Sequence, residues 1–588
     1  MPERKDDVPV ERILAFLERH WKLVIAGAWL LFAAWFLYSR WTQIQVFGLT
    51  DTDDNMRMMQ VRALLDGQDW FDLRQYRVSA PLGANMHWSR LVDLPLAGLI
   101  LALGPFLGGP EAERVAVALA PILPYFVLLF ALALTARRLI DPRAFILPVI
   151  AMILAGLANG MFMPTRIDHH GWQLALLSVA IAGLVDPRRV RGGITLGIST
   201  ALSFAIGVEM LIYLAIAGAA VALFWVADGK ERPRVIAYAS SLGGTIAFSF
   251  LAFASYDNRL PLCDALTPVW LSSLLLASAF LLLLALASPA DWRLRLALGA
   301  GAAALVALFH AAAWPHCITR LEGVSPEVYD LWLSKVREAR AVYTHGWRTV
   351  ALIIALPATG LVGWGLLAWR NRVDADLFRR TIAAALPALV AMALLFWQTR
   401  TGPAAQMLSV VGAVSIVWIF APMLDKIRNP VLRPVAVAAA ALIGLGAVVP
   451  LGLKLAPANK ASERDAKINR ANRLCNHIGS YRPIAKLEKA TIFTFVDTAP
   501  RLITVTHHDS IIGPYHRNGQ QIADAMKAFR GDAGQARSIF DKYGADYLLT
   551  CPNSSTTTIF LSEAPDGFYA QLSKGQVPDW LDPVELPE

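Results

Sequence analysis

Three aspartates crowd into four positions near the start of the chain, at Asp51, Asp53 and Asp54. Adjacent carboxylates repel one another and resist desolvation, so such a group is stabilised by a metal ion, another cation or a basic substrate group. The residues that follow, 56–65, have helical periodicity and would place Asp53 and Asp54 at the N-terminus of a helix. Aspartates that only cap this helix in a solvated loop explain the same spacing.

The segment 164–172 places one arginine, one aspartate and two histidines in a short connection between two apolar runs. Arg166, Asp168, His169 and His170 include both metal-ligand types and groups that bind phosphate. A turn between two helices needs none of these side chains. The alternative interpretation is a charged cap at the membrane interface that takes no part in chemistry.

A third acid-bearing segment, 315–347, contains a helix start at Ser325 and Pro326, because proline is favoured at the first helical position. The pattern predicts that this helix continues to Arg340. Helical spacing then puts four side chains on one face, namely Leu331, Ser334, Lys335 and Glu338. An amphipathic surface helix without catalytic duty explains this pattern as well.

The elements that must position these segments are membrane helices. The chain has 588 residues, of which 56% are hydrophobic and only 17% are charged. An ordinary soluble domain is about 45–50% apolar and about 25% charged. The apolar residues fall in runs of roughly 18–24 residues, the length that a helix needs to cross a bilayer. The net charge of +9 comes from Lys and Arg in short loops between these runs, which is typical of the positive-inside rule and argues against nucleic acid as a partner.

The distribution of Lys and Arg predicts about thirteen membrane spans, with the N-terminus in the cytoplasm and the C-terminus outside. Residues 1–22 are expected to form a cytoplasmic amphipathic segment, and residues 23–455 a transmembrane domain with outer loops at 41–112 and 315–347. The charge alternation also makes 94–109, which is rich in proline and glycine, a re-entrant or interfacial piece.

The tail, residues 456–588, is predicted to form a small α/β domain on the outer side of the membrane. Apolar, β-rich runs at 490–496, 502–505 and 547–551 alternate with helical stretches near 519–529 and 533–543.

The four cysteines all fall in segments assigned to the outer side. An oxidising compartment would allow two disulfides there, and the favoured pairing joins Cys263 to Cys317 and Cys475 to Cys551. Four unpaired, buried thiols are the alternative. No cysteine spacing is typical of a zinc site.

Taken together, these segments resemble the GT-C superfamily of membrane glycosyltransferases. The first outer loop resembles the superfamily's opening motif, an acid followed nine residues later by Arg and soon by Leu and Gly, at Asp53, Asp54, Arg62, Leu65 and Gly67. The stretch from Pro81 to Gly83, followed by Trp88, resembles the catalytic subunit of oligosaccharyltransferases. Asp168 matches the first residue of that subunit's second acidic motif, and Glu338 is the counterpart of the acid in its third.

The resemblance implies an enzyme that takes a sugar from a polyprenyl-phosphate carrier by an inverting displacement. The implied catalytic residues are Asp53, Asp54, Asp168 and Glu338. The implied ligands of a divalent cation, Mg²⁺ or Mn²⁺, are Asp53, Asp168, His169 and Glu338. Arg62 and Arg166 are then expected to contact the substrate.

One departure from the resemblance concerns the acceptor. The Trp-Trp-Asp motif with which oligosaccharyltransferases recognise their peptide sequon is missing from the tail, which instead contains Tyr515, His516 and Arg517 in a Gly-Pro turn. These three side chains are candidates for contact with a diphosphate or a glycan, and a purely structural turn is the alternative. The acceptor therefore stays open between a glycan, a lipid and a protein.

The function expected from the sequence is a membrane glycosyltransferase that moves a sugar or oligosaccharide from a polyprenyl-phosphate-linked donor to such an acceptor. Its surroundings are expected to be the lipids of a bacterial inner membrane, with the active site on the periplasmic side. The alternative is a transporter, flippase or assembly factor for lipid-linked glycans. Transporters place ionisable groups near the bilayer midplane, whereas here the acids crowd the outer loops and Glu209, the main acid of the apolar region, lies near a span boundary.

Overall fold

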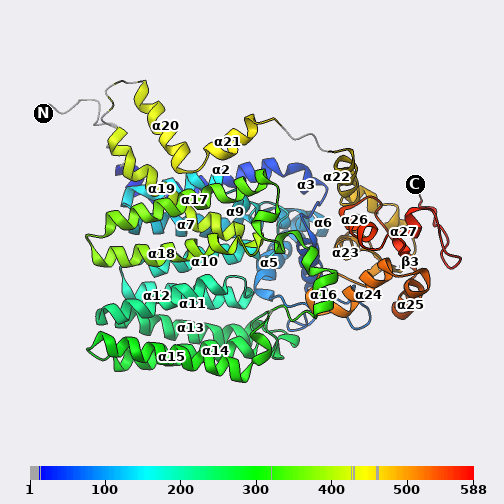
Figure 1. The fold of residues 1–588 in the computed structure, drawn as a ribbon, viewed down its shortest axis with the longest axis horizontal. Helices are drawn as coiled ribbons and strands as arrows, with labels where there is room; N and C mark the ends of the chain where they lie inside the picture. Colours follow the sequence, from blue (N-terminus) through cyan, green and yellow to red (C-terminus); the bar gives the residue numbers. More distant parts are fainter. Residues whose placement is uncertain are drawn as a thin grey trace.

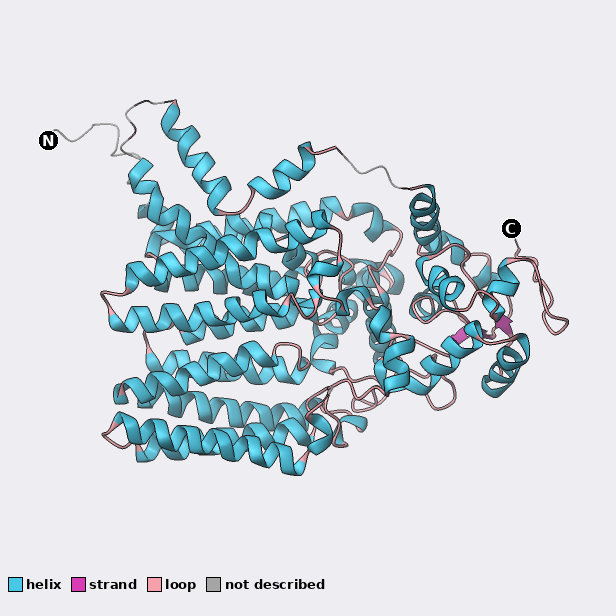
Figure 2. Ribbon diagram, viewed as in Figure 1, coloured by secondary structure: helices cyan, strands magenta, loops and turns pink. Residues whose placement is uncertain are grey.

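The computed structural model describes residues 12, 15–319, 321–424, 427, 429, 431–457 and 462–587. These residues form a large bundle of helices, and a smaller C-terminal domain packs against one end of it (Figure 1). We call that end of the bundle the domain end and the opposite end the far end. The predicted N-terminal amphipathic segment falls largely on residues outside the described ranges. Helices account for nearly all of the regular structure, and among the described residues strands occur only in the C-terminal domain (Figure 2).

The bundle is built from apolar helices, most of which run side by side, while the last two in chain order form a bent pair that stands off its edge (Figure 1). They are α2 (Trp21–Ser39), α5 (Arg90–Leu107), α6 (Gly109–Leu119), α7 (Ile122–Leu139), α10 (His170–Leu184), α11 (Arg189–Ile206), α12 (Leu211–Ala227), α13 (Arg232–Phe253), α14 (Pro268–Ala287), α15 (Trp292–Ala313), α17 (Trp347–Asn371), α18 (Ala375–Leu394), α19 (Gly402–Leu424), α20 (Leu432–Gly444) and α21 (Val448–Leu455). Small residues let the closest pairs approach: Gly193 and Gly197 of α11 lie against α13, and Gly360 of α17 lies against α19.

Nine helices in the described part of the chain are long and apolar enough to cross a membrane, or ten if the bent pair of α20 and α21 forms one span. Three shorter apolar helices lie between them, at Pro142–Leu154, His170–Leu184 and Leu211–Ala227. A polytopic helical fold is therefore confirmed, and the count of about thirteen spans stays a prediction.

The segment 94–109 differs from its prediction as a broken, re-entrant piece. It belongs to α5, a continuous helix of 18 residues that contains Pro95 and Pro105 and is apolar enough to cross a membrane. Proline is tolerated in such helices, because neighbouring groups satisfy the backbone atoms that it frees. The break comes only at Gly108, whose positive φ of 81° turns the chain into α6.

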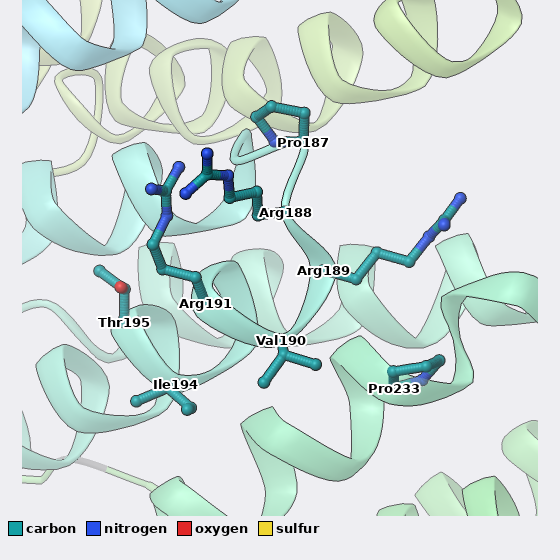
Figure 3. A pocket seen from close by; sticks show the side chains of 8 residues that line it. All are labelled: Pro187, Arg188, Arg189, Val190, Arg191, Ile194, Thr195 and Pro233. Atoms are coloured by element: carbon teal, nitrogen blue, oxygen red, sulfur yellow. The ribbon is translucent and has the colours of Figure 1, made fainter.

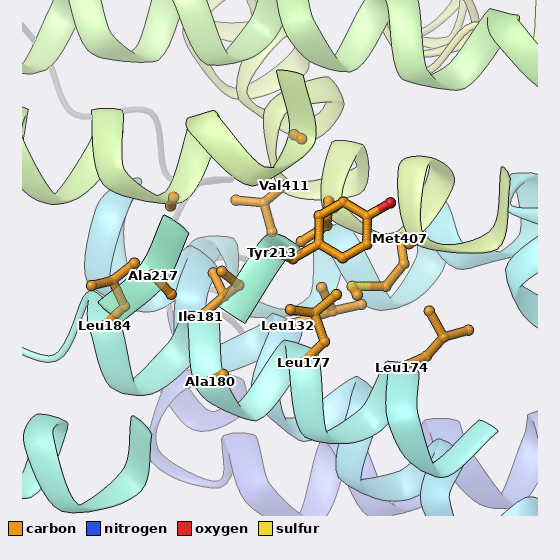
Figure 4. Close-up of a cluster of buried hydrophobic side chains, with 14 of the residues drawn as sticks. Leu132, Leu174, Leu177, Ala180, Ile181, Leu184, Tyr213, Ala217, Met407 and Val411 are labelled. Atoms are coloured by element: carbon orange, nitrogen blue, oxygen red, sulfur yellow. The ribbon is translucent and has the colours of Figure 1, made fainter. Parts of the chain in front are cut away.

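Helix α10 is the central element of the bundle. Its side chains pack on all sides, against α7, α12 and α19 (Figure 4), and include Leu174, Leu177 and Ile181. A helix that is apolar all round is held in a core. The two ends of α10 are therefore fixed, with Asp168 just before its first residue and Asp186 just beyond its last.

The C-terminal domain contains a three-stranded parallel sheet in the order β2-β1-β3. The strands are β1 (Thr491–Phe493), β2 (Asp509–Ser510) and β3 (Tyr547–Leu548), and the helices are α22 (Glu463–Cys475), α23 (Ala499–Val505), α24 (Gly519–Arg530), α25 (Ala533–Tyr543), α26 (Ser555–Glu563) and α27 (Phe568–Ser573). The predicted strands at 490–496 and 547–551 and both predicted helices are confirmed. The predicted strand at 502–505 is wrong, since it forms α23, the crossover that a parallel pair of strands requires.

Both predicted disulfides are confirmed. Cys263 and Cys317 join the loops on either side of the α14–α15 hairpin, with their Cα atoms 5.4 Å apart. Cys475 and Cys551 join the end of α22 to the loop after β3, with Cα atoms 6.1 Å apart.

The loop 315–347 folds differently from its prediction. A helix starts at the expected place, but α16 (Pro326–Leu331) ends after six residues. Trp332 leaves the helical conformation, and three short turns follow: η6 (Leu333–Lys335), η7 (Arg337–Ala339) and η8 (Val342–Thr344). The reason is tertiary packing, because Val328 and Trp332 are buried in the core of the C-terminal domain.

Candidate active site

The first acidic segment forms the N-terminus of α4 (Thr52–Leu65). Asp51 caps this helix, since its Oδ1 accepts hydrogen bonds from the backbone N–H groups of Asp53 at 3.0 Å and Asp54 at 3.2 Å. Asp54 completes a capping box, because its Oδ2 accepts from the N–H of Asp51 at 3.0 Å. The capping interpretation thus applies to Asp51 and Asp54, and Asp53 makes no such contact.

The segment 164–172 lies directly against these aspartates. The N–H of Asp168 donates to Oδ1 of Asp54 at 3.0 Å. Arg166 forms ion pairs with Asp168 at 2.7 Å, with Asp54 at 3.4 Å and with Asp51. Two segments more than a hundred residues apart therefore build one cluster, in which a single guanidinium group faces three carboxylates. We call Asp51, Asp53, Asp54 and Asp168 the acid cluster.

Burial and mutual repulsion change the protonation of the acid cluster. Burial, and next the charge of Asp168, raise the pKa of Asp53 to about 7. The same two causes raise the pKa of Asp54 well above its ordinary value. Burial also acts on Asp168, but Arg166 and then His170 outweigh it and hold the pKa of Asp168 below its usual range. Two carboxyl groups in the cluster are therefore ready to take up a proton or a cation.

The two histidines point in different directions. His170 Nδ1 lies 2.9 Å from Oδ2 of Asp168, so this ring belongs to the acid cluster. His169, the imidazole that the sequence assigned as a metal ligand, places Nε2 2.9 Å from Glu209. Glu209 precedes α12 and also accepts a hydrogen bond from Gln173. Sequence reasoning placed Glu209 near a span boundary but missed its contact with His169.

The acid cluster has the chemistry of a divalent-cation site. One carboxylate oxygen from each of Asp51, Asp54 and Asp168 lies within 4.8 Å of the others. Carboxylates with a nearby imidazole suit Mg²⁺ and Mn²⁺ as well as Zn²⁺. The chemistry of these donors therefore fits the divalent cation that the sequence predicts, but Asp51 and Asp54 were not predicted as ligands, and Asp168 is the predicted ligand that the set contains.

Aromatic side chains cover the cluster. Trp88 lies over the guanidinium of Arg57 at 4.2 Å, and its ring is 5.5 Å from Tyr515 and 6.0 Å from His169. Tyr515 is buried, and its hydroxyl donates to the carbonyl of Thr52 at 3.2 Å. The C-terminal domain thereby reaches the first turn of α4.

Two buried imidazole nitrogen atoms near Trp88, Nδ1 of His87 and Nδ1 of His169, have no hydrogen-bond partner among the described residues, and neither has Nε of Arg57 at the same ring. The ring centroids of His87 and His169 lie 6.1 Å and 6.0 Å from that of Trp88. Burial lowers the pKa of each. Buried polar atoms are normally hydrogen-bonded, so a pair of unused ones next to an acid cluster is characteristic of a ligand subsite.

The remaining predicted residues divide into two groups. Arg62 is paired with Glu113 at 2.7 Å and donates to the carbonyl of Thr504 at 2.8 Å, so it joins α4 to α6 and α23. His516 and Arg517 both contact Asp264, at 2.5 Å and 2.7 Å. These three side chains are engaged in contacts within the protein, whereas Tyr515 borders the acid cluster.

Glu338 lies in η7 and is exposed to solvent. Its charge acts on Asp53 and contributes to the raised pKa of that group. The third predicted segment therefore lies near the first two, although the helix that was expected to carry Glu338 is absent.

Asp497 is a further acid that sequence reasoning missed. It follows β1, and its charge acts on the hydroxyl of Tyr515. Ligands gather at the carboxyl ends of parallel strands. An aspartate directly after a buried, β-rich run is the signal that would have found it.

No protein-family model and no curated protein sequence matches this chain. Solved structures of the oligosaccharyltransferase of Archaeoglobus fulgidus, however, resemble it over most of its length. The complex of this protein, AglB, with an inhibitory peptide and a dolichol-phosphate has a TM-score of 0.63 and 13% identity, and the match covers 91% of this chain and 70% of that one. The apo form has a TM-score of 0.60 and 15% identity, with 89% and 69% covered.

A third structure of the same oligosaccharyltransferase, in complex with Zn and sulfate, has a TM-score of 0.56 and 12% identity, and the match covers 89% of this chain and 67% of that one. At such identities the likeness concerns the fold. The predicted likeness to the fold of an oligosaccharyltransferase is therefore confirmed.

Proposed function

We propose that this protein is a membrane glycosyltransferase that moves a sugar or oligosaccharide from a polyprenyl-phosphate-linked donor to an acceptor. The observation that carries the proposal is the acid cluster, in which buried carboxylates from two distant segments meet one arginine. A solvated acidic loop has no reason to bury them, because desolvation of carboxylates costs free energy. The shared fold with an oligosaccharyltransferase that was solved with a dolichol-phosphate supports the same class of donor.

Asp53 is the proposed group that orients the acceptor and takes its proton. Unlike Asp51 and Asp54, it is not used in capping α4. A general base works best when its pKa is near the working pH, and burial together with Asp168 raises the pKa of Asp53 to about 7. Asp54 stands beside it and shares its electrostatic surroundings.

A divalent cation is proposed to be held by Asp51, Asp54 and Asp168, with His170 in place of the predicted His169, so that Asp53, also predicted as a ligand, is left to act as the base. When bound, such an ion would neutralise charge on the departing phosphate. The archaeal structure with Zn supports a cation at this fold. Glu338 of the loop 315–347 is proposed as a further ligand of the cation. Its charge acts on Asp53, which supports its place near the cluster.

The leaving phosphate is proposed to bind to Arg166, with an N–H of the buried His87 ring as a second donor. Arg166 is 11% exposed and already balances three carboxylates, so a cation in the cluster would free part of its guanidinium for a phosphate. His87 would supply a buried hydrogen-bond donor of the kind that stabilises developing negative charge, whereas His169 donates its Nε2–H to Glu209 and keeps only an acceptor at Nδ1.

The reaction then balances as a displacement at the anomeric carbon. The bond from this carbon to the acceptor oxygen or nitrogen forms, while its bond to the phosphate oxygen breaks. The acceptor proton goes to Asp53, and the electron pair leaves with the lipid phosphate. One displacement inverts the anomeric configuration, and the outer, periplasmic face of a bacterial inner membrane is the proposed setting.

The test is transfer of a labelled sugar from a polyprenyl-diphosphate donor by the purified protein in vesicles, with glycan, lipid and peptide acceptors supplied in parallel. Asp53→Asn and Asp168→Asn should each lower the rate by about 10²–10⁴-fold, the contribution of general base and charge stabilisation. The matched control is Asp141→Asn, because Asp141 caps a short helix (η1, Pro142–Phe145) remote from the cluster. Undiminished transfer by the folded Asp53→Asn protein would show that the assignment is wrong.

A further inference from the structure

A groove at the far end of the bundle is lined by arginines and apolar side chains. It has a volume of about 750 Å³ and is lined by Pro187, Arg188, Arg189, Val190, Arg191, Ile194, Thr195 and Pro233 (Figure 3). We call it the arginine groove. Helix α10 separates it from the acid cluster, and its 15 residues correspond to about 22 Å at the helical rise. The groove therefore lies at the level where the opposite ends of the spanning helices meet a membrane surface.

Guanidinium groups outnumber carboxylates around the groove. Asp186 forms ion pairs with Arg138 at 2.7 Å and with Arg191 at 2.6 Å. Glu231 forms ion pairs with Arg189 at 2.7 Å and with Arg234 at 2.6 Å. Each of these two acids is thus shared by two arginines, and the charges of Asp228 and Asp376 also act on Arg189.

Arg188 contributes a further positive charge that has no ion pair with a described residue. Its side chain is exposed and has no ion pair or hydrogen bond to any residue in the described part of the chain, although its neighbours Arg189 and Arg191 each have a partner. The side chains of Arg188 and Arg191 lie next to one another (Figure 3). Arg191 is already paired with Asp186, so Arg188 is the member of this pair without a counter-charge among the described residues.

An exposed apolar stripe begins where the arginines end. Val190, Ile194 and Ile198 follow one another at intervals of four along α11 and are 52%, 42% and 39% exposed. Residues four apart share one face of a helix, so the stripe runs from the groove toward the middle of the bundle. A surface with cations at the membrane boundary and an apolar strip below them is complementary to a molecule with an anionic head and an acyl tail.

The first turn of α11 adds to the attraction. Arg188 is its N-cap, and no side chain caps the free N–H groups of this turn. The helix dipole places partial positive charge at the same point as the arginines.

We propose that the arginine groove binds the headgroup of an anionic phospholipid, whose acyl chain lies along Val190, Ile194 and Ile198. The lipid phosphate accepts hydrogen bonds from Arg188 and Arg191. A free phosphate would satisfy the arginines but leave the apolar stripe uncovered, whereas a phospholipid covers both. This site is separate from the proposed transfer reaction and makes no use of the acid cluster.

The experiment uses the full chain in phosphatidylcholine micelles, to which phosphatidylglycerol is added, with bound lipid counted by native mass spectrometry. Arg188→Gln should weaken phosphatidylglycerol binding about fivefold, and Arg188→Gln with Arg191→Gln about thirtyfold, since each basic residue near a membrane surface contributes a comparable factor. Ile194→Ser should weaken it as well. Arg188→Gln alone breaks no contact within the protein, so it tests the proposal even if the double variant is unstable.

The matched control is Arg293→Gln, an exposed arginine at the start of α15, at the same end of the bundle but outside the groove. It should change binding less than about twofold. Inorganic phosphate and glycerol phosphate, added separately, should not displace the lipid. Equal binding of phosphatidylcholine, unchanged binding by Arg188→Gln, or displacement by inorganic phosphate would each overturn the proposal.

Discussion

The two ends of the bundle carry charge in opposite ways. At the domain end, carboxylates crowd together, are buried, and come from segments far apart in the sequence, as Asp54 and Asp168 do. At the far end, the arginines that line the groove are largely exposed and come from one stretch of chain at 188–191, whereas Arg138 and Arg234, which share their acids, are 13% and 2% exposed. Buried contacts between distant segments build the acid cluster, whereas one exposed stretch of chain supplies the arginines of the arginine groove.

This difference predicts where a substitution lowers the stability of the protein most. A charge left without its partner in the interior loses both the attraction and the hydration that it would have in water. A charge left unpaired at the surface is simply hydrated. The domain end should therefore be sensitive to single changes, and the far end tolerant of them.

The largest effect is expected at Asp93. Its carboxylate forms ion pairs with Arg57 at 2.7 Å and with Arg90 at 3.2 Å, and all three side chains are at most 1% exposed. Asp93→Asn leaves two buried guanidinium groups without a counter-charge, which should lower the free energy of unfolding by about 3–5 kcal/mol. The measurement is unfolding in mixed micelles.

The matched control for Asp93 is Glu111→Gln. Glu111 pairs with Arg114 in the neighbouring helix α6, but the two side chains are 53% and 30% exposed. This change should cost less than about 1 kcal/mol. Equal losses for the two substitutions would refute the claim that burial sets the sensitivity of the domain end.

Much of this arrangement follows from sequence patterns, since hydropathy and charge alternation indicate a polytopic bundle with a separate tail. The acids that form the cluster were also found, because acids in short outer loops are conspicuous. Which imidazole faces Asp168 was not predictable. Successive helical residues point about 100° apart, so the start of α10 decides whether His169 or His170 turns toward the cluster.

Other features were missed where a distant partner decides the structure. Motif spacing predicts that Arg62 contacts substrate, which stays a prediction, but it gave no sign of the ion pair with Glu113 of α6. Helical spacing predicted a long helix through Glu338, but the C-terminal domain buries Trp332 and ends α16. Asp264 carried no local signal beyond its place next to Cys263, and its partners His516 and Arg517 lie about 250 residues further along the chain. Such long-range contacts are invisible in the periodicity of one segment.

The second largest effect is expected for the disulfide of the C-terminal domain. The bond between Cys475 and Cys551 closes a loop with a sequence separation of 76. Cys475→Ser together with Cys551→Ser should destabilise this domain by about 2–4 kcal/mol, because the open chain gains conformational entropy when it unfolds. Unfolding can be followed by limited proteolysis of the tail. A reducing agent should bring the unsubstituted protein to the same stability, and resistance to that treatment would contradict the prediction.

Asp264 offers a test at the contact between the C-terminal domain and the bundle loops. Its carboxylate binds Arg517 at 2.7 Å and His516 at 2.5 Å. Asp264→Asn should cost about 2–3 kcal/mol at neutral pH, the range for charged hydrogen bonds whose partner is left buried. Asp257→Asn is the control, because Asp257 lies in the same loop but pairs with Arg74, which is 36% exposed.

The effect of Asp264 should depend on pH in a defined direction. Burial alone would raise the pKa of Asp264, but hydrogen bonds from His516 and Arg517 hold it below its ordinary value. A carboxyl group with a lowered pKa in the folded state adds stability above its unfolded pKa and loses it as the pH falls. The difference between the unsubstituted protein and Asp264→Asn should thus be full at pH 7 and shrink below about pH 4. A difference that grows in acid would contradict this.

The smallest effect is expected at the far end. Arg189 pairs with Glu231 at 2.7 Å, but its side chain is 39% exposed, and Glu231 keeps Arg234 as a second partner. Arg189→Gln should therefore lower the free energy of unfolding by less than about 1 kcal/mol, because a surface pair gains little over two hydrated ions and the buried acid is not left alone. Unfolding in the same mixed micelles as for Asp93→Asn makes the two ends directly comparable. A loss of the size expected at Asp93 would mean that the arginines of the far end hold the bundle together rather than present a surface, and the contrast between the two ends would fail.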